Sequence, residues 1–153
     1  MKKLIIAAFI AVAITGSAFA KPTETTTETV SYRVLNSFKA DFADAENVSW
    51  KIDKDFVKAS FILENEKMEA FYNNDGELIA TSKAIAFDKL PKKALKTITT
   101  KYPFPPYSLE ECIELTNADG VTNYYVNLKK GSEKLPLEIT KTGDVSEFKK
   151  GSK

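Results

Sequence analysis

The sequence contains no histidine and only one cysteine among its 153 residues. Histidine is the commonest general base and the commonest zinc ligand, so its absence removes Ser-His and Cys-His nucleophile pairs and most zinc sites. The single cysteine, Cys112, cannot close an intramolecular disulfide, so stability must come from apolar packing. Free cysteines are among the most buried residue types, which predicts a small buried side chain at Cys112, with a reactive or intermolecular thiol as the alternative.

Long apolar runs are also lacking, except at the N-terminus. Residues 1–20 combine Lys2-Lys3, an apolar run from Leu4 to Ile14, and Ala18-Phe19-Ala20, which is the order of a secretory signal peptide cleaved after Ala20. The run is shorter than the roughly 20 apolar residues that a membrane helix needs, so we expect no stable membrane insertion after cleavage. The sequence therefore predicts a periplasmic or secreted protein.

A strong charge of either sign is missing as well. The chain has 22 basic and 21 acidic groups, and loss of Lys2 and Lys3 with the signal peptide would leave 20 against 21. Such a balance creates no field that attracts nucleic acid, and we expect no nucleic-acid partner. The lysines at 149, 150 and 153 are typical of a solvated tail.

No glycine-rich phosphate loop, nucleophile motif or metal-ligand spacing occurs, and we predict no catalytic residue, no cofactor and no metal site. The run Asn73-Asn74-Asp75-Gly76 resembles a calcium loop, but Phe71 and Ser82 occupy the positions where such a loop needs an acid and a glutamate. We interpret this run as a hairpin turn. We expect the protein not to be an enzyme, because an active site would have to be assembled from carboxylates or lysines alone.

Carboxylates gather at Glu110, Glu111 and Glu114. Strict alternation along a strand would place Glu110 and Glu114 on one face, with Cys112 between them. We interpret the group as a solvated strand face, and an acid–base pair with one desolvated member is the alternative.

After a flexible leader at residues 21–29, the pattern indicates two tandem units, at about 30–89 and 90–150. In the first unit, Val34, Leu35, Phe38 and Phe42 form one apolar stripe on a helix. Alternating runs at 48–52, 57–64 and 67–73 predict three strands, and residues 78–79 begin a short fourth strand or an exit segment. Ile85 and Phe87 are expected to cap this first core.

The second unit repeats the order of the first. The residues Ala94, Leu95, Ile98 and Tyr102 repeat the first apolar stripe at a constant offset of 60, and three strands follow at 109–115, 124–129 and 135–139. In the second unit, Ile113 and Leu115 are predicted to take the places that Val48 and Trp50 have in the first. The predicted fold is α+β, with two α-β-β-β(-β) repeats that form an antiparallel sheet with helices on one face.

One combination of residues resembles a known family. The spacing Phe38-x3-Phe42-x2-Ala45-x2-Val48-x-Trp50, followed by the turn at Tyr72-Asn73-Asn74-Asp75-Gly76, resembles the PepSY-like family of small exported bacterial proteins across most of residues 30–150. The sequence departs from the family at Ala43, where a proline is common, and in its second copy, which carries Leu115 in place of the tryptophan. The resemblance implies an architecture related to the β-lactamase inhibitor protein and to metallopeptidase propeptides. It implies a binding or inhibitory role and assigns no active site.

Two groups of apolar residues are candidate contacts for a partner. Alternation places Ile62, Phe71 and Tyr125 on the sheet face without helices, where aromatic side chains suit a protein interface; the alternative is that they cover one another or pack under the leader. The segment from Tyr102 to Tyr107, which includes Phe104, is predicted to be rigid and extended because of its three prolines. We therefore expect a non-enzymatic module that binds another exported protein, inhibiting or chaperoning it. A small-ligand carrier with a cavity between helices and sheet is the alternative.

Overall fold

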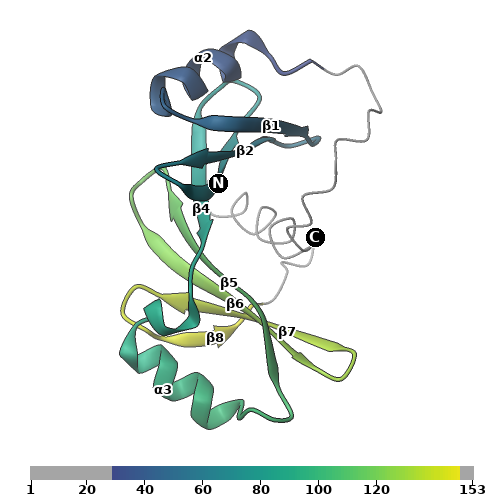
Figure 1. Cartoon of the computed structure of the whole chain (residues 1–153), viewed down its shortest axis with the longest axis vertical. Coiled ribbons are helices and arrows are strands. Elements are labelled where there is room, and N and C mark those ends of the chain that lie inside the picture. The colour runs from purple at the N-terminus through teal and green to yellow at the C-terminus, as the bar shows by residue number, and fades with distance from the viewer. Residues whose placement is uncertain (1–28, 149–153) are drawn as a thin grey trace.

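The computed structural model describes residues 29–148, and the predicted signal peptide, most of the predicted leader and the C-terminal lysines lie outside this range. The described chain forms an α+β fold with one eight-stranded antiparallel sheet, whose strands lie side by side in sequence order (Figure 1). The elements are α2 (Tyr32–Asp41), β1 (Glu46–Ile52), β2 (Val57–Leu63), β3 (Glu66–Tyr72), β4 (Leu78–Ala84), a 3-10 turn (Phe87–Lys89), α3 (Lys92–Lys101), β5 (Ser108–Asn117), β6 (Thr122–Lys130), β7 (Glu133–Thr140) and β8 (Val145–Glu147).

The N-terminal helix begins and ends where its capping groups allow. The Ser31 hydroxyl accepts a hydrogen bond from the Val34 N–H at 3.4 Å, which satisfies one free donor of the first turn of α2. The helix buries Val34 and Phe38 against β1–β3, as the apolar stripe predicts. The first cluster comprises Val34, Phe38, Val57, Ala59, Phe61, Ala70 and Tyr72, with Phe42 and Trp50 among the side chains packed around it.

Val48 does not belong to this core, although strict alternation along residues 48–52 predicts that it shares the buried face with Trp50. Its side chain is 36% exposed. The register between β1 and β2 shifts between Glu46 and Ser49, and Asn47 has a φ of 53°. This bulge interrupts the alternation that the sequence pattern assumed.

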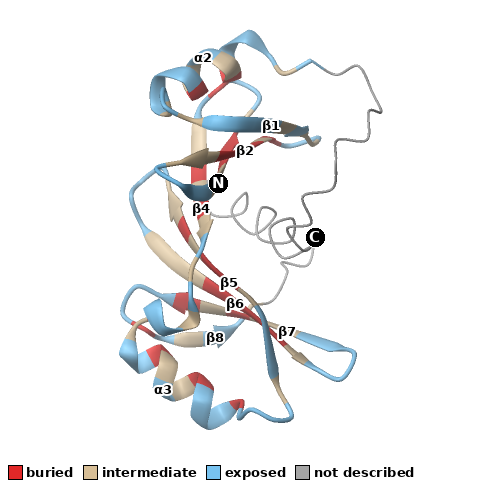
Figure 2. Ribbon diagram, viewed as in Figure 1, coloured by how far each residue is buried: buried red, intermediate tan, exposed pale blue. Residues whose placement is uncertain are grey.

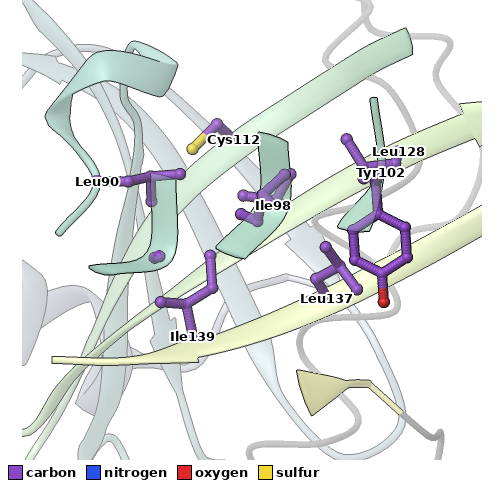
Figure 3. Packing of buried hydrophobic residues seen from close by; sticks show 9 residues of the cluster. Leu90, Ile98, Tyr102, Cys112, Leu128, Leu137 and Ile139 are labelled. Atoms are coloured by element: carbon purple, nitrogen blue, oxygen red, sulfur yellow. The ribbon is translucent and has the colours of Figure 1, made fainter. Parts of the chain in front are cut away.

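The C-terminal helix covers the other end of the sheet in the same way. Figure 3 shows Ile98 of α3 directed toward Leu128, Leu137 and Ile139 of the strands. Ile85 and Phe87 pack here, around the second cluster, and not against the first core as predicted. The reason is that β4 continues as far as Ala84, so the residues after it have already reached the second half. The second cluster comprises Leu90, Ala94, Ile98, Tyr102, Cys112, Val126, Leu128, Leu137 and Ile139.

One continuous sheet joins the two halves, because β4 pairs with β5 from Ala80↔Asn117 to Ala84↔Ile113. The register across this seam shows that both helices cover the same face. Ala70 of the first cluster lies opposite Thr81, and Thr81 lies opposite Thr116. Cys112 of the second cluster is four residues from Thr116 along β5 and so points to the same side. We call the opposite side the helix-free face. Figure 2 shows buried residues both on the helices and along the strands beneath them.

The proposed match between Leu115 and Trp50 is wrong. Trp50 packs around the first cluster on the helix-covered side, whereas Leu115 belongs to a cluster on the helix-free face. In β5 the side chain that faces α3 is Cys112, which is buried as the sequence predicts. Burial, followed by the Glu111 charge, raises the pKa of the Cys112 thiol to about 12.

Each helix meets a glycine in a turn between two strands. Gly76, in the turn from β3 to β4, has a φ of +86°, and a Cβ there would lie 2.9 Å from the carbonyl carbon of Arg33. Gly143, in the turn from β7 to β8, has a φ of +87°, and a Cβ there would lie 3.0 Å from the Lys93 Cβ. The two approaches require glycine both for its backbone conformation and for the missing side chain. Among the described helices, none is long and apolar enough to cross a membrane.

Candidate binding face

The helix-free face carries the three residues that the alternation placed there. Ile62 pairs with Lys67 and is half-buried, while Phe71 and Tyr125 are 0% and 3% exposed. Their placement on this face follows the prediction. Phe71 and Tyr125 are buried in one apolar cluster, which agrees with the alternative that the residues of this face cover one another.

This helix-free cluster spans the middle of the sheet. Two ring contacts mark its ends: Phe56 and Phe71 have centroids 5.9 Å apart, and Tyr125 and Phe148 have centroids 5.8 Å apart in an edge-to-face arrangement. Such aromatic pairs add to the free energy gained by burying the rings. The cluster comprises Phe56, Phe71, Ala80, Ile113, Leu115 and Tyr125, with Ile79 and Phe148 packed around it.

Polar groups anchor the cluster at the Tyr125 side. The Tyr125 hydroxyl donates a hydrogen bond of 2.8 Å to Glu138 Oε1, and the Asn123 amide donates to the same oxygen at 3.3 Å. Burial, followed by the bond to Glu138, raises the pKa of Tyr125 above that of a free tyrosine. The phenol therefore stays neutral and holds its ring in place on β6.

A second polar group crosses β2, β3 and β4 beside Phe71. The Lys58 ammonium lies 2.5 Å from Glu69 Oε1, and the Lys58 and Glu69 side chains are 13% and 25% exposed. The hydroxyls of Ser60 and Ser82 lie 3.4 Å from the two Glu69 oxygens. Residues 58, 60, 69 and 82 thus form a connected polar patch next to the apolar cluster.

A bulge in β5 brings further carboxylates to this face. The register changes from Leu109↔Leu128 to Glu111↔Asn127, so Glu110 has no residue of its own opposite on β6. The Asn127 Nδ2 donates to Glu110 Oε2 at 3.4 Å. Glu114 lies on the other face, opposite Lys83 and Tyr124. The prediction that Glu110 and Glu114 share a face is therefore wrong, because the bulge breaks the alternation.

The proline segment lies elsewhere and has a different shape from the predicted one. Tyr102 is buried in the second cluster, on the helix-covered side. The Tyr107 N–H donates to the Pro103 carbonyl at 3.2 Å, and the rings of Tyr102 and Tyr107 are 5.3 Å apart. The segment is thus a turn, not an extended strand. Phe104 alone among its aromatic residues is largely exposed, at 45%, and it contacts Phe87.

Several residues of this face were not identified as site residues from the sequence. The alternation that places Tyr125 on the helix-free face also places Asn127 there, so that signal was present. Ile113 and Leu115 were assigned to the other face by analogy with Trp50. Phe56 lies between two predicted strands and Phe148 lies beyond the last one, so alternation gives no direction for either side chain. Within residues 29–148, no group of three or more His, Cys, Asp or Glu side chains is placed to hold a metal ion.

The architecture defines the chain as an α+β protein with an open antiparallel sheet and two helices on one face. Solved structures with this fold include a "putative periplasmic" protein from Bacteroides eggerthii, at 15% identity and a TM-score of 0.69 over 76% of this chain and 86% of that chain. A BLIP-like protein from Bacteroides fragilis gives 15% identity and a TM-score of 0.67 over 78% and 85%. A DUF2874 family protein from Bacteroides ovatus gives 16% identity and 0.67 over 78% and 89%. These likenesses establish the fold. No protein-family model and no curated protein matches the sequence.

Proposed function

We propose that the protein is an exported, non-enzymatic module that binds another exported protein through its helix-free face, inhibiting or chaperoning that partner. The observation that carries the proposal is the composition of this face. An apolar, aromatic centre is bordered by half-buried charged groups, which is the arrangement of protein–protein interfaces. The BLIP-like protein of similar fold supports a binding role.

The proposal gives different roles to the buried and the accessible residues of the face. Phe71 and Tyr125 form its rigid base, and Tyr125 is held by the bond to Glu138. Ile62 is half-buried and Ala84 is exposed, so these are the positions that a docked partner contacts. A firm base loses little side-chain entropy on binding, which favours affinity.

We also propose export through a signal peptide at residues 1–20, an assignment to the PepSY-like family, and tandem duplication of the two halves. Export is supported by the charge and apolar pattern of those residues and by the similar "putative periplasmic" protein. Duplication is supported by the matching glycine contacts, in which Gly76 meets Arg33 and Gly143 meets Lys93. Both glycines also lie next to an ion pair, Arg33–Asp75 at 3.5 Å and Lys93–Asp144 at 2.5 Å.

Site-specific photo-crosslinking in the exporting bacterium tests the proposed face. A photoreactive phenylalanine is placed at Ile62 or Ala84 on the helix-free face, and at Lys96 or Thr100, which are exposed on α3, as matched controls. We expect the two positions on the sheet to yield the same protein adduct and the helix positions to yield none. Adducts from α3 only, equal adducts from both surfaces, or none from any position would refute the proposal.

Protein binding is favoured over the small-ligand carrier because side chains occupy the space where a carrier needs its cavity. Ala94 and Ile98 of α3 are 0% exposed and belong to one cluster with residues of β6 and β7. Figure 3 shows Ile98 among Leu128, Leu137 and Ile139 of these strands. A carrier would be recognised by a melting temperature that rises with ligand concentration in a screen of small molecules. We expect no small molecule to bind between the helices and the sheet and raise the melting temperature.

A further inference from the structure

The bulge in β5 places two carboxylates and an amide side by side on the helix-free face. Glu111 is the direct partner of Asn127 in the ladder, and the extra residue, Glu110, accepts a hydrogen bond from the Asn127 amide nitrogen. This bond fixes the amide orientation, because the opposite orientation would set a carbonyl oxygen against a carboxylate. The Asn127 carbonyl oxygen is left to find another donor.

That oxygen has no donor in the structure. Asn127 is only 4% exposed, and its Oδ1 is the one buried side-chain oxygen or nitrogen of the described residues that lacks a hydrogen-bond partner. A buried acceptor without a donor is unfavourable, and native proteins seldom keep one without a reason.

The Glu111 carboxylate also lacks a donor among the described residues. Within residues 29–148 no hydrogen bond or ion pair within 4 Å involves its half-buried carboxylate, whereas Glu110 has the Asn127 amide and the ammonium groups of Lys129 and Lys134 at 3.6 and 3.5 Å. Burial, followed by the charges of Glu69 and Glu110, raises the pKa of Glu111, and the more distant charges of Lys134 and Lys58 only partly oppose this rise. Two neighbouring acceptors on adjacent strands therefore both lack a donor.

We infer that Glu111 and Asn127 together hold the guanidinium group of an arginine side chain on the partner. The inference rests on the proposed function, whose binding face contains both residues. Opposed side chains on paired strands are about 5 Å apart at their Cβ atoms, a spacing that the planar fork of a guanidinium can bridge with separate N–H groups. Two oxygens are too few for calcium, which takes six to eight.

The surroundings suit arginine more than lysine. Tyr125 and Ile113, which are 3% and 5% exposed, lie two residues from Asn127 and Glu111 on the same face and make the floor of the site apolar. A guanidinium is also more weakly hydrated than an ammonium, so it loses less on entering a half-buried site. Lys129 and Lys134, which pair with Glu110 and are 43% and 57% exposed, are accessible enough to turn toward solvent when the arginine enters.

The test is a titration of the exported, purified protein with the peptide acetyl-Leu-Arg-Leu-amide. Binding is measured from the NMR signals of the Asn127 side-chain amide. We expect a saturable shift, with binding about tenfold weaker when citrulline, the neutral isostere, replaces arginine. Lysine in place of arginine should also bind more weakly. Equal binding of the citrulline or lysine peptide, or no saturable shift, would overturn the inference; the last result would mean that water satisfies Asn127.

Two variants assign the effect to the pair. Glu111→Gln keeps the shape of the side chain and should weaken binding of the arginine peptide about tenfold. Glu114→Gln, on the other face of the same strand, should leave this binding unchanged. Unchanged binding in Glu111→Gln would overturn the inference. Crosslinking from Ile62 and Ala84 does not depend on Glu111. Crosslinked adducts without arginine binding would therefore refute this inference alone. Arginine binding without crosslinked adducts would refute the proposed function.

Discussion

Replacement of Gly76 by alanine should destabilise the protein far more than the same change at Gly120. Both glycines lie in turns and have left-handed backbones, with φ of +86° and +76°. They differ in what a side chain would meet. A Cβ at Gly76 would lie 2.9 Å from the Arg33 carbonyl carbon in α2, whereas a Cβ at Gly120 would have nothing within 4 Å. The pair therefore separates backbone conformation from close approach.

The expected magnitudes follow from these two contributions. A left-handed conformation costs an alanine about 1–2 kcal/mol, and this applies to both variants. Overpacking against the Arg33 backbone adds about 1–3 kcal/mol to Gly76→Ala alone, because helix backbone cannot rotate away as a flexible side chain does. For a domain of about 120 residues, 1 kcal/mol lowers the melting temperature by roughly 4 °C. We expect losses of roughly 4–8 °C for Gly120→Ala and roughly 8–20 °C for Gly76→Ala.

Urea and thermal unfolding of the two variants and the wild type, followed by far-ultraviolet circular dichroism, measure the difference. Gly120→Ala is the control, since it shares the backbone conformation. If the two variants lose the same free energy of unfolding, the contact between α2 and the β3–β4 turn contributes nothing, and the reasoning about close approach is refuted.

Three further outcomes are expected. Burial and neighbouring carboxylates raise the pKa of Glu111, so ionisation of this side chain destabilises the folded state. The destabilisation is absent below the pKa of the unfolded state, 4.5, and grows as pH rises through the pKa of the folded state. Glu111→Gln should therefore melt higher than wild type at pH 7 but not at pH 4, and a variant that is less stable at both values would contradict this. Tyr72→Phe removes the 2.9 Å hydrogen bond to Asp41 and should lower the free energy of unfolding in urea by about 1 kcal/mol; an unchanged midpoint would show that this bond contributes nothing. Burial raises the pKa of Cys112 to about 12, so a thiol reagent at pH 8 should label it only in denaturant, and rapid labelling of the native protein would be inconsistent with its burial.

The main elements could be predicted from the sequence because their patterns are local. The helix that buries Val34 and Phe38 and the helix that buries Ala94 and Ile98 follow directly from three- and four-residue spacing. The alternation of β2, β3 and β6 gives the two faces correctly, which placed Ile62, Phe71 and Tyr125. The full length of β4 was not predicted, because its polar residues pair with β5, a partner that local patterns do not reveal.

The details of the helix-free face depended on features that alternation cannot detect. A bulge adds one residue without a sequence signal, and after it every side chain of a strand changes face relative to the simple pattern. Glu110 and Val48 were misplaced for this reason. The burial of Phe71 and Tyr125 depends on side chains from distant strands, which share a cluster only after the whole sheet has formed.

The bulge in β1 also affects how the molecule meets others. An edge strand with free N–H and C=O groups invites another strand to extend the sheet, which leads to aggregation. Here one edge strand, β1, is distorted near Asn47, and the other, β8, has only three residues. Both ends of the sheet therefore oppose strand addition. Two copies of the chain are therefore hindered from extending one sheet into the other through their edges.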